Sequence, residues 1–339
     1  MSRNGRINVA VVGVGLMGET HVRAYLNNPF TNVVSIADAD EARAKEMAAK
    51  YSINRYYTDY GEMLDKEDLQ AISVATPERY HRGPAEKAAR MGIHVLCEKP
   101  IAATMKDALA IVDACSSSKV KLLVGYASRF EPIYTIAKER IQEGKVGEIN
   151  LIRSHRTDPI SITKRVSEWT NLIFYDAVHD IDLVQWYSES RVVRVYAEGS
   201  SKLLGSKGPD VIQATLKLDD GAVGSIATNW IVPDKKPTTF EQRTEVWGTK
   251  GVMKIEVDNR QLQIDTSDGS EYPDTVFFPT MYGHPTGAVK EEVDHFVNCI
   301  RKDLRPVVGG EEGVQTLSVA LAIIESYNTG RIVATAKTE

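Results

Sequence analysis

Residues 7–18 read INVAVVGVGLMG, an apolar β-branched run that leads into a G-x-G-x-x-G pattern. The run INVAVV predicts a strand that is buried on both faces. Between that strand and a following helix, Gly13 permits a tight turn and Gly15 lets a pyrophosphate approach the backbone. Gly18 allows the helix to pack closely on the strand, and the helix N-terminus offers its amides to an anion. This stretch predicts a dinucleotide-binding unit.

A carboxylate follows the second predicted strand. The first helix should run from Leu16 to Asn27, and the strand at 32–37 ends in Asp38, about 20 residues beyond the glycines. A carboxylate at this place accepts the ribose 2′-hydroxyl and repels the 2′-phosphate of NADP. Arg43 leaves NADP as an alternative cofactor, since a guanidinium nearby can accommodate that phosphate. The cofactor predicted is therefore NAD, with NADP less favoured.

Strands and helices continue to alternate as far as residue 126. Strands are predicted at 69–75, 93–97 and 121–126, and helices at 40–51, 79–91 and 104–117. Repeated βα units form a parallel, doubly wound sheet that binds ligands at the carboxyl ends of its strands. We therefore expect a Rossmann domain over residues 1–126. Its ligand-binding rim should carry Thr76, Pro77, Glu98, Lys99, Tyr126 and Arg129.

Lys99 lies between a buried strand and Pro100, so this lysine cannot swing free as a helix-surface lysine can. A lysine held at a cofactor rim can have a lowered pKa and can hydrogen-bond a substrate hydroxyl. An ion pair with Glu98 or a fully solvated side chain is the plain alternative. Position alone does not separate these readings.

The pattern changes after residue 147 to strands in succession. They are predicted at 148–157, 191–198, 210–218, 222–230, 239–248 and 251–257, with helices at 175–188, 291–302 and 314–327. Such runs of strands are typical of an antiparallel sheet, so an α/β domain should be followed by an α+β domain over 127–339. Asp220-Gly221 suits a hairpin turn. The large open, mainly antiparallel sheet would leave one face for a homodimer or homotetramer, and the C-terminal helices could pack back on the first domain.

The run FYDAVHDIDLVQW at 174–186 gathers Asp176, His179, Asp180 and Asp182 in an apolar helix. At helical spacing two or three of them could converge on a metal ion. No second cluster of His, Cys or Glu at recognisable spacing supplies the other ligands, so we predict no metal site. Asp180 suits the start of a helix, where the dipole favours carboxylates, and Asp182 could orient the imidazole.

The composition is that of a cytoplasmic globular protein. The chain has 339 residues, 42% of them hydrophobic and 26% charged, and its net charge of −5 offers no basic field to nucleic acid. No apolar run approaches the roughly 18 residues of a membrane span, and the N-terminus lacks a signal-peptide pattern. The three cysteines have no metal-like or redox-like spacing, which suits a reducing compartment. We expect a small-molecule partner, with neither nucleic acid nor membrane.

Several motifs follow one another in an order that resembles the Gfo/Idh/MocA oxidoreductases, a family that includes glucose–fructose oxidoreductase and inositol 2-dehydrogenase. Besides the glycine loop with Asp38, they are ATPERYH (75–81), GIHVLCEKP (92–100), GYASRFEP (125–132), H-x-x-D (179–182) and WGTKGVMKIE (247–256). The resemblance covers nearly the whole chain. It implies a Rossmann domain, a second domain on a large open sheet, and a nicotinamide held over a pocket for a sugar or cyclic polyol.

The resemblance also assigns roles. It maps the family lysine onto Lys99, with a cis peptide before Pro100, and the family histidine onto His179. Oxidising a secondary alcohol needs a base for the hydroxyl proton and a polar group that holds the oxygen. An imidazole, with an ordinary pKa of about 6.5, suits the first task and an ammonium the second. Many relatives carry an aspartate four residues before the histidine; here Tyr175 occupies that position and Asp176 lies three before, so the acid stays open between them.

The candidate cofactor contacts are Gly13, Gly15, Leu16, Met17, Gly18, Asp38, Thr76, Pro77, His81, Glu98 and Lys99. The candidate substrate contacts are Lys99, Tyr126, Arg129, Arg156, Asp158, Tyr175, Asp176, His179 and Tyr282. The candidate catalytic residues are Lys99, His179 and Asp176. A sugar phosphate or nucleotide sugar stays open as substrate because of Arg153, Arg156, Lys164 and Arg165. We expect an NAD(P)-dependent oxidoreductase; the alternative is a catalytically silent sensor that binds NAD(P) and sugar.

Overall fold

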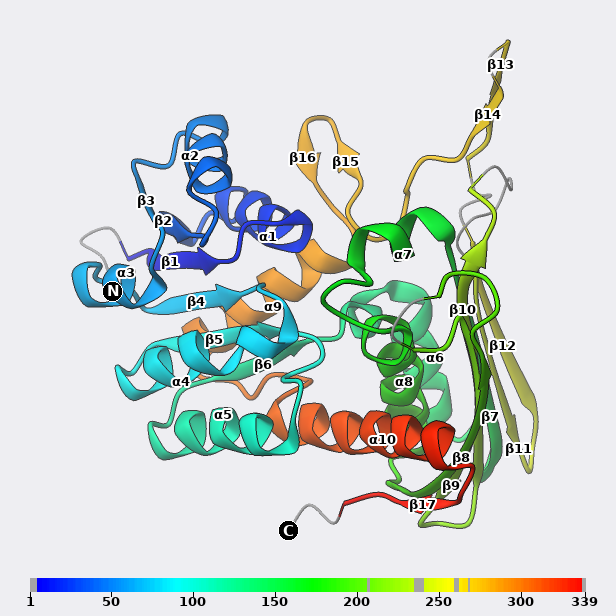
Figure 1. Cartoon of the computed structure of the whole chain (residues 1–339). Coiled ribbons are helices and arrows are strands. Elements are labelled where there is room, and N and C mark those ends of the chain that lie inside the picture. Colours follow the sequence, from blue (N-terminus) through cyan, green and yellow to red (C-terminus); the bar gives the residue numbers. More distant parts are fainter. Residues whose placement is uncertain (1–4, 206–207, 235–240, 259–261, 268, 337–339) are drawn as a thin grey trace. The chain divides into compact units, whose positions relative to one another are not determined.

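The computed structural model describes residues 5–205, 208–234, 241–258, 262–267 and 269–336. The chain divides into two compact units (Figure 1). The first comprises Met1–Phe130 and Val276–Val314, and the second comprises Glu131–Thr275 and Gln315–Glu339. Residues 276–314 thus group with the N-terminal unit, although they follow the second sheet in sequence.

The first unit is built on a parallel sheet of six strands in the order β3-β2-β1-β4-β5-β6. These strands are β1 (Ile7–Val12), β2 (Thr31–Ala37), β3 (Arg55–Tyr57), β4 (Ala71–Val74), β5 (His94–Glu98) and β6 (Leu122–Gly125). The order is that of a doubly wound dinucleotide-binding sheet, so the predicted fold class is confirmed. The short β3 was not predicted, because its three residues, Arg-Tyr-Tyr, are largely exposed and carry no apolar run.

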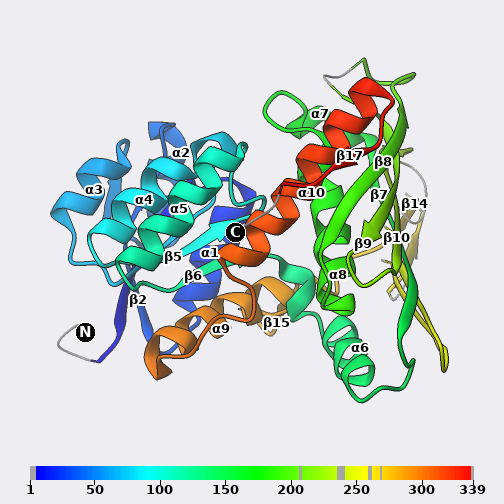
Figure 2. The same ribbon diagram turned by 90° about the horizontal axis from the view of Figure 1, so that it is seen from below.

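Helices cover this sheet: α1 (Leu16–Leu26), α2 (Glu41–Lys50), α3 (Tyr60–Lys66), α4 (Arg82–Arg90), α5 (Met105–Ser117) and α9 (Ala288–Lys302). Side chains cap several N-termini; Asp40 accepts from the Arg43 amide, and Thr104 accepts from the Asp107 amide. At α1 the N-cap is Gly15, which has no side chain to bond the first-turn amides. Helices α1 and α9 lie side by side (Figure 1 and Figure 2).

The second unit carries a seven-stranded sheet in the order β12-β11-β7-β10-β9-β8-β17. Its strands are β7 (Ile149–Pro159), β8 (Val192–Ser200), β9 (Val211–Leu218), β10 (Val223–Val232), β11 (Glu241–Gly248), β12 (Val252–Asp258) and β17 (Val333–Ala334). Neighbouring strands are antiparallel except β7 and β10, which pair in parallel. The mainly antiparallel sheet is therefore confirmed. The predicted hairpin joins β9 to β10, with Gly221 at φ +100° in its turn.

The helices α6 (Pro132–Gln142), α7 (Ile160–Val166) and α8 (Val178–Ser188) lie on one side of this sheet (Figure 1). The helix predicted at 175–188 begins earlier, as a π-helical turn over Ile173–Ala177 that runs into α8. The sequence patterns did not indicate α6, α7 or two small hairpins. These hairpins are β13 (Ile264–Thr266) with β14 (Gly269–Glu271), and β15 (Thr280–Met281) with β16 (His284–Pro285). The last helix, α10, spans Gly310–Thr329.

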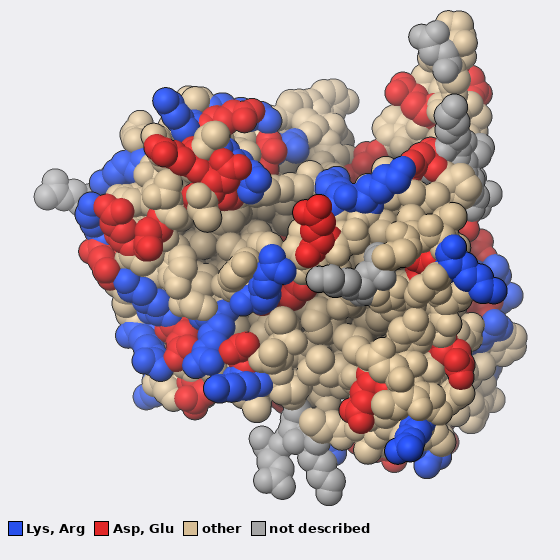
Figure 3. All heavy atoms as spheres, in the orientation of Figure 1, with Lys and Arg blue, Asp and Glu red and all other residues tan. Residues whose placement is uncertain are grey.

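The surface and the cysteines agree with the composition. Figure 3 shows acidic and basic side chains interspersed on the face in view. Among the residues that the structure describes, no helix combines the length and the apolarity that crossing a bilayer requires. Cys97, Cys115 and Cys299 are buried thiols, and burial raises the pKa of each. They are interior apolar groups.

Candidate active site

The glycine loop of the first unit has the geometry that its sequence predicts. Gly13 adopts φ +82°, and a Cβ there would lie 2.8 Å from the backbone of Ala75 and Thr76. A Cβ on Gly18 would overlap the carbonyl oxygen of Gly13. A Cβ on Gly15 would meet no atom within 4 Å, so the backbone at this position faces open space. The loop thus combines a tight turn, close helix packing and an accessible anion-binding end of α1.

Asp38 is fixed beside this loop. Its Oδ2 accepts from the Val14 amide at 2.9 Å, and its Oδ1 accepts from the Asp40 amide at 2.9 Å. Arg43 Nη1 lies 3.4 Å from Asp38, and its side chain is 49% exposed. The carboxylate therefore holds its position without the arginine. A fixed carboxylate next to the glycine loop suits a ribose with free hydroxyls better than one with a 2′-phosphate.

The segment after β4 contributes a hydroxyl and a buried imidazole. Thr76 Oγ1 is buried and has no hydrogen-bond partner among the described residues. His81 is 1% exposed; its Nε2 lies 2.7 Å from the Thr76 carbonyl and its Nδ1 3.3 Å from the Ile101 carbonyl. Burial lowers the pKa of His81, so the ring is neutral at pH 7. The structure places His81 beneath the rim, buried between the Thr76 and Ile101 carbonyls, and the single N–H of the neutral ring can donate to one of them.

Lys99 follows β5 at the same rim. The Lys99–Pro100 peptide is cis, as the family resemblance implies. The side chain of Lys99 is half-buried, and its amide donates to Glu98 Oε2 at 3.2 Å. Burial alone would raise the pKa of Glu98, but the contact with His21 and the charge of Lys99 bring it below the ordinary value. Glu98 is therefore a buried carboxylate that is ionised at neutral pH.

Three predicted substrate residues of this unit have different surroundings. Tyr126 is fully buried. Arg129 is 6% exposed, and its Nη1 donates to the Val307 carbonyl at 3.1 Å. Tyr282 is 93% exposed, because it occupies the turn between β15 and β16 with φ +52°. Its ring is therefore exposed to solvent within its own unit.

In the second unit, the π-helical turn and α8 carry the candidates Tyr175, Asp176 and His179. Asp176, Asp180 and Asp182 are 3%, 1% and 1% exposed, whereas Tyr175 and His179 are half-buried. A π-helical turn is wider than an α-helical one, so positions four apart come more nearly into line than positions three apart. Tyr175 thus lies one turn before His179 on a similar face. Isolated π-turns within helices are frequent at functional sites.

Asp180 lies in the first turn of α8, as the sequence predicted, but it is buried there and has side-chain partners. Ser154 Oγ donates to its Oδ1 at 2.6 Å, and Arg156 Nε lies 3.5 Å from its Oδ2. Burial raises the pKa of Asp180, and the charge of Arg156 opposes that shift. Arg156 is itself only 4% exposed. The burial and the partners of Asp180 were not predicted, because they depend on β7 packing against α8, a long-range contact that the helix sequence does not encode.

The strand alternation of β7 separates the basic residues that were considered for phosphate. Arg156 is buried, whereas Arg153, three positions earlier, is on the opposite face, where its side chain is 61% exposed and pairs with Glu245 at 3.6 Å. Lys164 and Arg165 are exposed on α7. Arg153 and Arg156 therefore cannot converge on one phosphate.

Four predicted substrate residues do come together in this unit. The charges of Asp176 and Asp158 act on Arg156, together with Asp180. The pKa of Tyr175 is raised by burial and by the charges of Asp158 and Asp176, and Arg165 opposes that shift. This cluster offers hydroxyl, carboxylate and guanidinium groups, which can hydrogen-bond a polyol. Tyr175 is its half-buried member.

The sequence patterns did not indicate two further residues, His21 on α1 and Glu292 on α9. With Glu98 they form the one group of three in the described residues whose metal-type ligand atoms all lie within 4.8 Å of one another. A signal for Glu292 existed, because it interrupts the apolar face of a strongly amphipathic helix between Val289 and Val293. A carboxylate at such a position is rarely buried without a partner.

Comparisons with known proteins cover both units. A family model described as an oxidoreductase family with an NAD-binding Rossmann fold matches residues 7–126, and the model of the C-terminal α/β domain of that family matches 138–335. The chain is 28% identical to an inositol 2-dehydrogenase of Rhizobium meliloti, over 94% of this chain and 96% of that protein. It is 26% identical to a scyllo-inositol 2-dehydrogenase (NAD(+)) of Bacillus subtilis, over 96% of this chain and 95% of that protein.

Solved structures share the fold. A scyllo-inositol dehydrogenase from Lactobacillus casei with bound NAD(H) and scyllo-inositol superposes with a TM-score of 0.83. The two chains are 22% identical, and the match covers 98% of this chain and 100% of the other. A likeness at this identity establishes the architecture of both units.

Proposed function

Because the chain belongs to the Gfo/Idh/MocA oxidoreductase family, we propose that it is an NAD-dependent dehydrogenase of a secondary hydroxyl in a cyclic polyol or sugar. The observation that carries the proposal is the accessibility of Lys99 and His179. Each is half-buried and follows or precedes a buried carboxylate in the chain, Glu98 before Lys99 and Asp180 after His179. Polar groups that combine partial access with buried support are typical of reactive positions.

The first unit has the groups that would hold the cofactor. The open backbone at Gly15 and the first-turn amides of α1 would bind the pyrophosphate, and Asp38 would accept the ribose hydroxyls. The unpartnered hydroxyl of Thr76 is available at the same rim. NAD, when bound, supplies the hydride acceptor. The position of Asp38 supports NAD over NADP.

The proposed chemistry of the protein concerns one proton and one oxygen. His179 takes the hydroxyl proton, as its imidazole can at neutral pH. The ammonium of Lys99 hydrogen-bonds the same oxygen and stabilises the negative charge that develops on it. Asp176 supports the imidazole, and Tyr175 and Asp158 bind further hydroxyls. The separation of Arg153 from Arg156 favours an uncharged polyol over a sugar phosphate.

The test is NAD reduction by the full chain across a panel of inositols, free sugars and sugar phosphates. We expect turnover with at least one uncharged polyol or sugar. Tight NAD binding without turnover on any of them would instead support the silent sensor. His179→Ala should lower kcat by about 10²- to 10⁴-fold with NAD affinity unchanged. His284→Ala is the matched control, because His284 is exposed on β16.

We also propose that the protein is cytoplasmic and forms a homodimer or homotetramer through the open face of the seven-stranded sheet. The support is an apolar patch on that face. Trp247 and Val252 are 39% and 47% exposed and pair directly across β11 and β12. Leu151 of β7 is the neighbour of Trp247 on the other side. Light scattering of Trp247→Glu should show smaller particles than the unaltered chain, and an unchanged mass would remove this face as the interface.

A further inference from the structure

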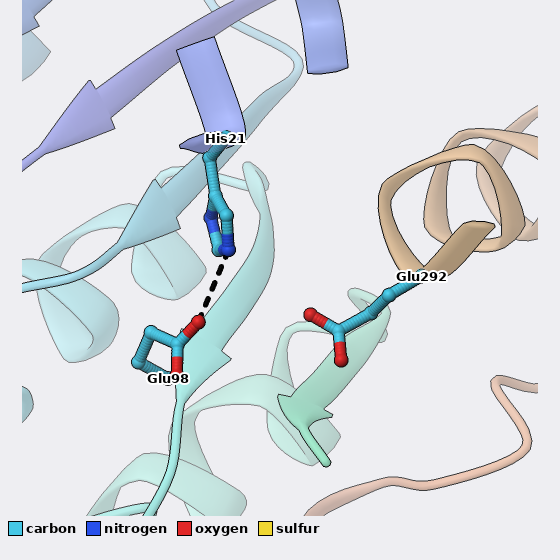
Figure 4. A group of neighbouring side chains, drawn as sticks. All are labelled: His21, Glu98 and Glu292. Atoms are coloured by element: carbon cyan, nitrogen blue, oxygen red, sulfur yellow. Dashed lines mark ion pairs between the residues drawn. The ribbon is translucent and has the colours of Figure 1, made fainter. Parts of the chain in front are cut away.

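Three ionisable side chains meet inside the first unit (Figure 4). His21 comes from α1, Glu98 from the end of β5 and Glu292 from α9, and they are 0%, 6% and 1% exposed. Nothing in the proposed reaction requires His21 or Glu292. Burying three such groups costs free energy unless they satisfy one another. Their role therefore needs an explanation.

The carboxylate of Glu98 is the centre of this cluster. His21 Nε2 lies 3.1 Å from its Oε1, and the Lys99 amide donates to its Oε2 at 3.2 Å. Gly125 of β6 makes room for it, because a Cβ at that position would lie 3.1–3.2 Å from the carboxylate atoms of Glu98. The carboxylate is thus confined by α1 and β6 and is itself bonded to the backbone of Lys99.

Glu292 closes the cluster from the side of α9. Its Oε2 is buried without a hydrogen-bond partner among the described residues, and Nδ1 of His21 likewise has none. Burial, and then the charge of Glu98, raise the pKa of Glu292 well above its ordinary value. Two carboxylates so close in a dry interior cannot both be ionised. Since Glu98 keeps its charge through His21 and Lys99, the proton resides on Glu292.

A divalent cation is the competing occupant. A structural zinc site closes with four protein ligands. The histidines, cysteines and carboxylates that the structure describes supply three here. A single proton on Glu292 removes the repulsion between the two carboxylates, leaves the remaining charge on Glu98 beside His21 and Lys99, and needs no further ligand. The proton is therefore the simpler occupant of the cluster.

We propose that His21 and Glu292 are positioning residues for Lys99, because they hold the Glu98 carboxylate to which the Lys99 backbone is bonded. This inference rests on the role of Lys99 in the proposed function. The lysine follows Glu98 directly, so a shift of that carboxylate moves the backbone from which the ammonium extends. A misplacement of about 1 Å can cost up to about 100-fold in rate.

The test uses the full chain and two measurements, kcat for polyol oxidation and the rate at which an acylating reagent labels Lys99, followed by mass spectrometry. His21→Leu and Glu292→Leu should lower kcat by about 10- to 100-fold and change the labelling rate of Lys99, with KM for NAD unchanged. Glu292→Gln, which keeps the shape of a neutral carboxyl group, should retain most of the kcat and most of the Lys99 labelling rate of the unaltered chain. Glu291→Gln, an exposed neighbour on α9, is the control. If the leucine variants do not fold, Gly125→Ala displaces the Glu98 carboxylate without removing a polar group, and it should give the same effects.

The outcomes separate the inference from the function on which it rests. If the unaltered chain oxidises no polyol, the proposed function fails, and labelling of Lys99 still tests the positioning role. Labelling and kcat in the leucine and alanine variants equal to those of Glu291→Gln would overturn the inference. Elemental analysis that finds one equivalent of a divalent metal, lost in Glu292→Leu, would also overturn it in favour of a metal site.

Discussion

Glu292→Gln should make the protein progressively more stable than the unaltered chain as pH rises above about 5. Glu292 has a pKa raised well above 4.5 in the folded chain, by burial and then by the charge of Glu98, whereas the unfolded chain releases the proton near 4.5. The folded state therefore holds one more proton over the window between these two pKa values, and stability falls with pH there. The glutamine carries no titrating proton, so it escapes this loss.

The size of the stability difference between Glu292→Gln and the unaltered chain follows from the titration of one proton. Each pH unit in the window changes the free energy of unfolding by about 1.4 kcal/mol per proton, so the difference between variant and unaltered chain should grow with up to that slope. The difference becomes constant once the pH exceeds the folded pKa. The titratable groups that face Glu292 are Glu98, His21 and Tyr25. Glu98, with its lowered pKa, is ionised in both proteins above pH 5 and cancels in the comparison.

The assay is urea unfolding of the unaltered chain, Glu292→Gln and Glu291→Gln at several values between pH 5 and pH 8, followed by tryptophan fluorescence. Glu291→Gln should parallel the unaltered chain, because residue 291 is exposed. A pH-independent difference for Glu292→Gln, or one that shrinks as pH rises, would refute the assignment of a proton to Glu292.

Three further outcomes test the site. Asp38→Asn should weaken NAD binding by about 10- to 100-fold, because the charge-assisted bonds to the ribose are lost. It should also reduce the preference for NAD over NADP, and the dissociation constants of both cofactors measure these two effects. In steady-state kinetics, Asp176→Asn should lower kcat by about 100-fold, while Tyr175→Phe should chiefly raise KM for the polyol. If Tyr175→Phe instead lowers kcat and Asp176→Asn chiefly raises KM, Tyr175 is the residue that supports the imidazole. Gly18→Ala should lower stability by about 3 kcal/mol and abolish NAD binding, because its Cβ would overlap the Gly13 carbonyl; thermal unfolding and NAD titration check this.

Features that depend only on short segments of the chain were predictable. The glycine loop, the strand that precedes it and Asp38 depend on local conformation and on a fixed spacing, and the structure shows each with the expected geometry. The alternation of apolar strands with helices predicted the parallel sheet, because each unit is built from neighbouring residues. Secondary structure without an apolar run, such as β3, left no such signal.

Features that depend on partners far along the chain were not predictable. The parallel pairing of β7 with β10 and the burial of Asp180 against Arg156 join segments far apart in the sequence, and no local pattern indicated the π-helical turn before His179. The sequence by itself determined the dinucleotide loop, the fold class and the candidate pair Lys99 and His179. Only the tertiary structure brought His21, Glu98 and Glu292 into one buried cluster. Local spacing sets backbone conformation, whereas the neighbours of a buried charge are set by helices and strands that meet only after folding.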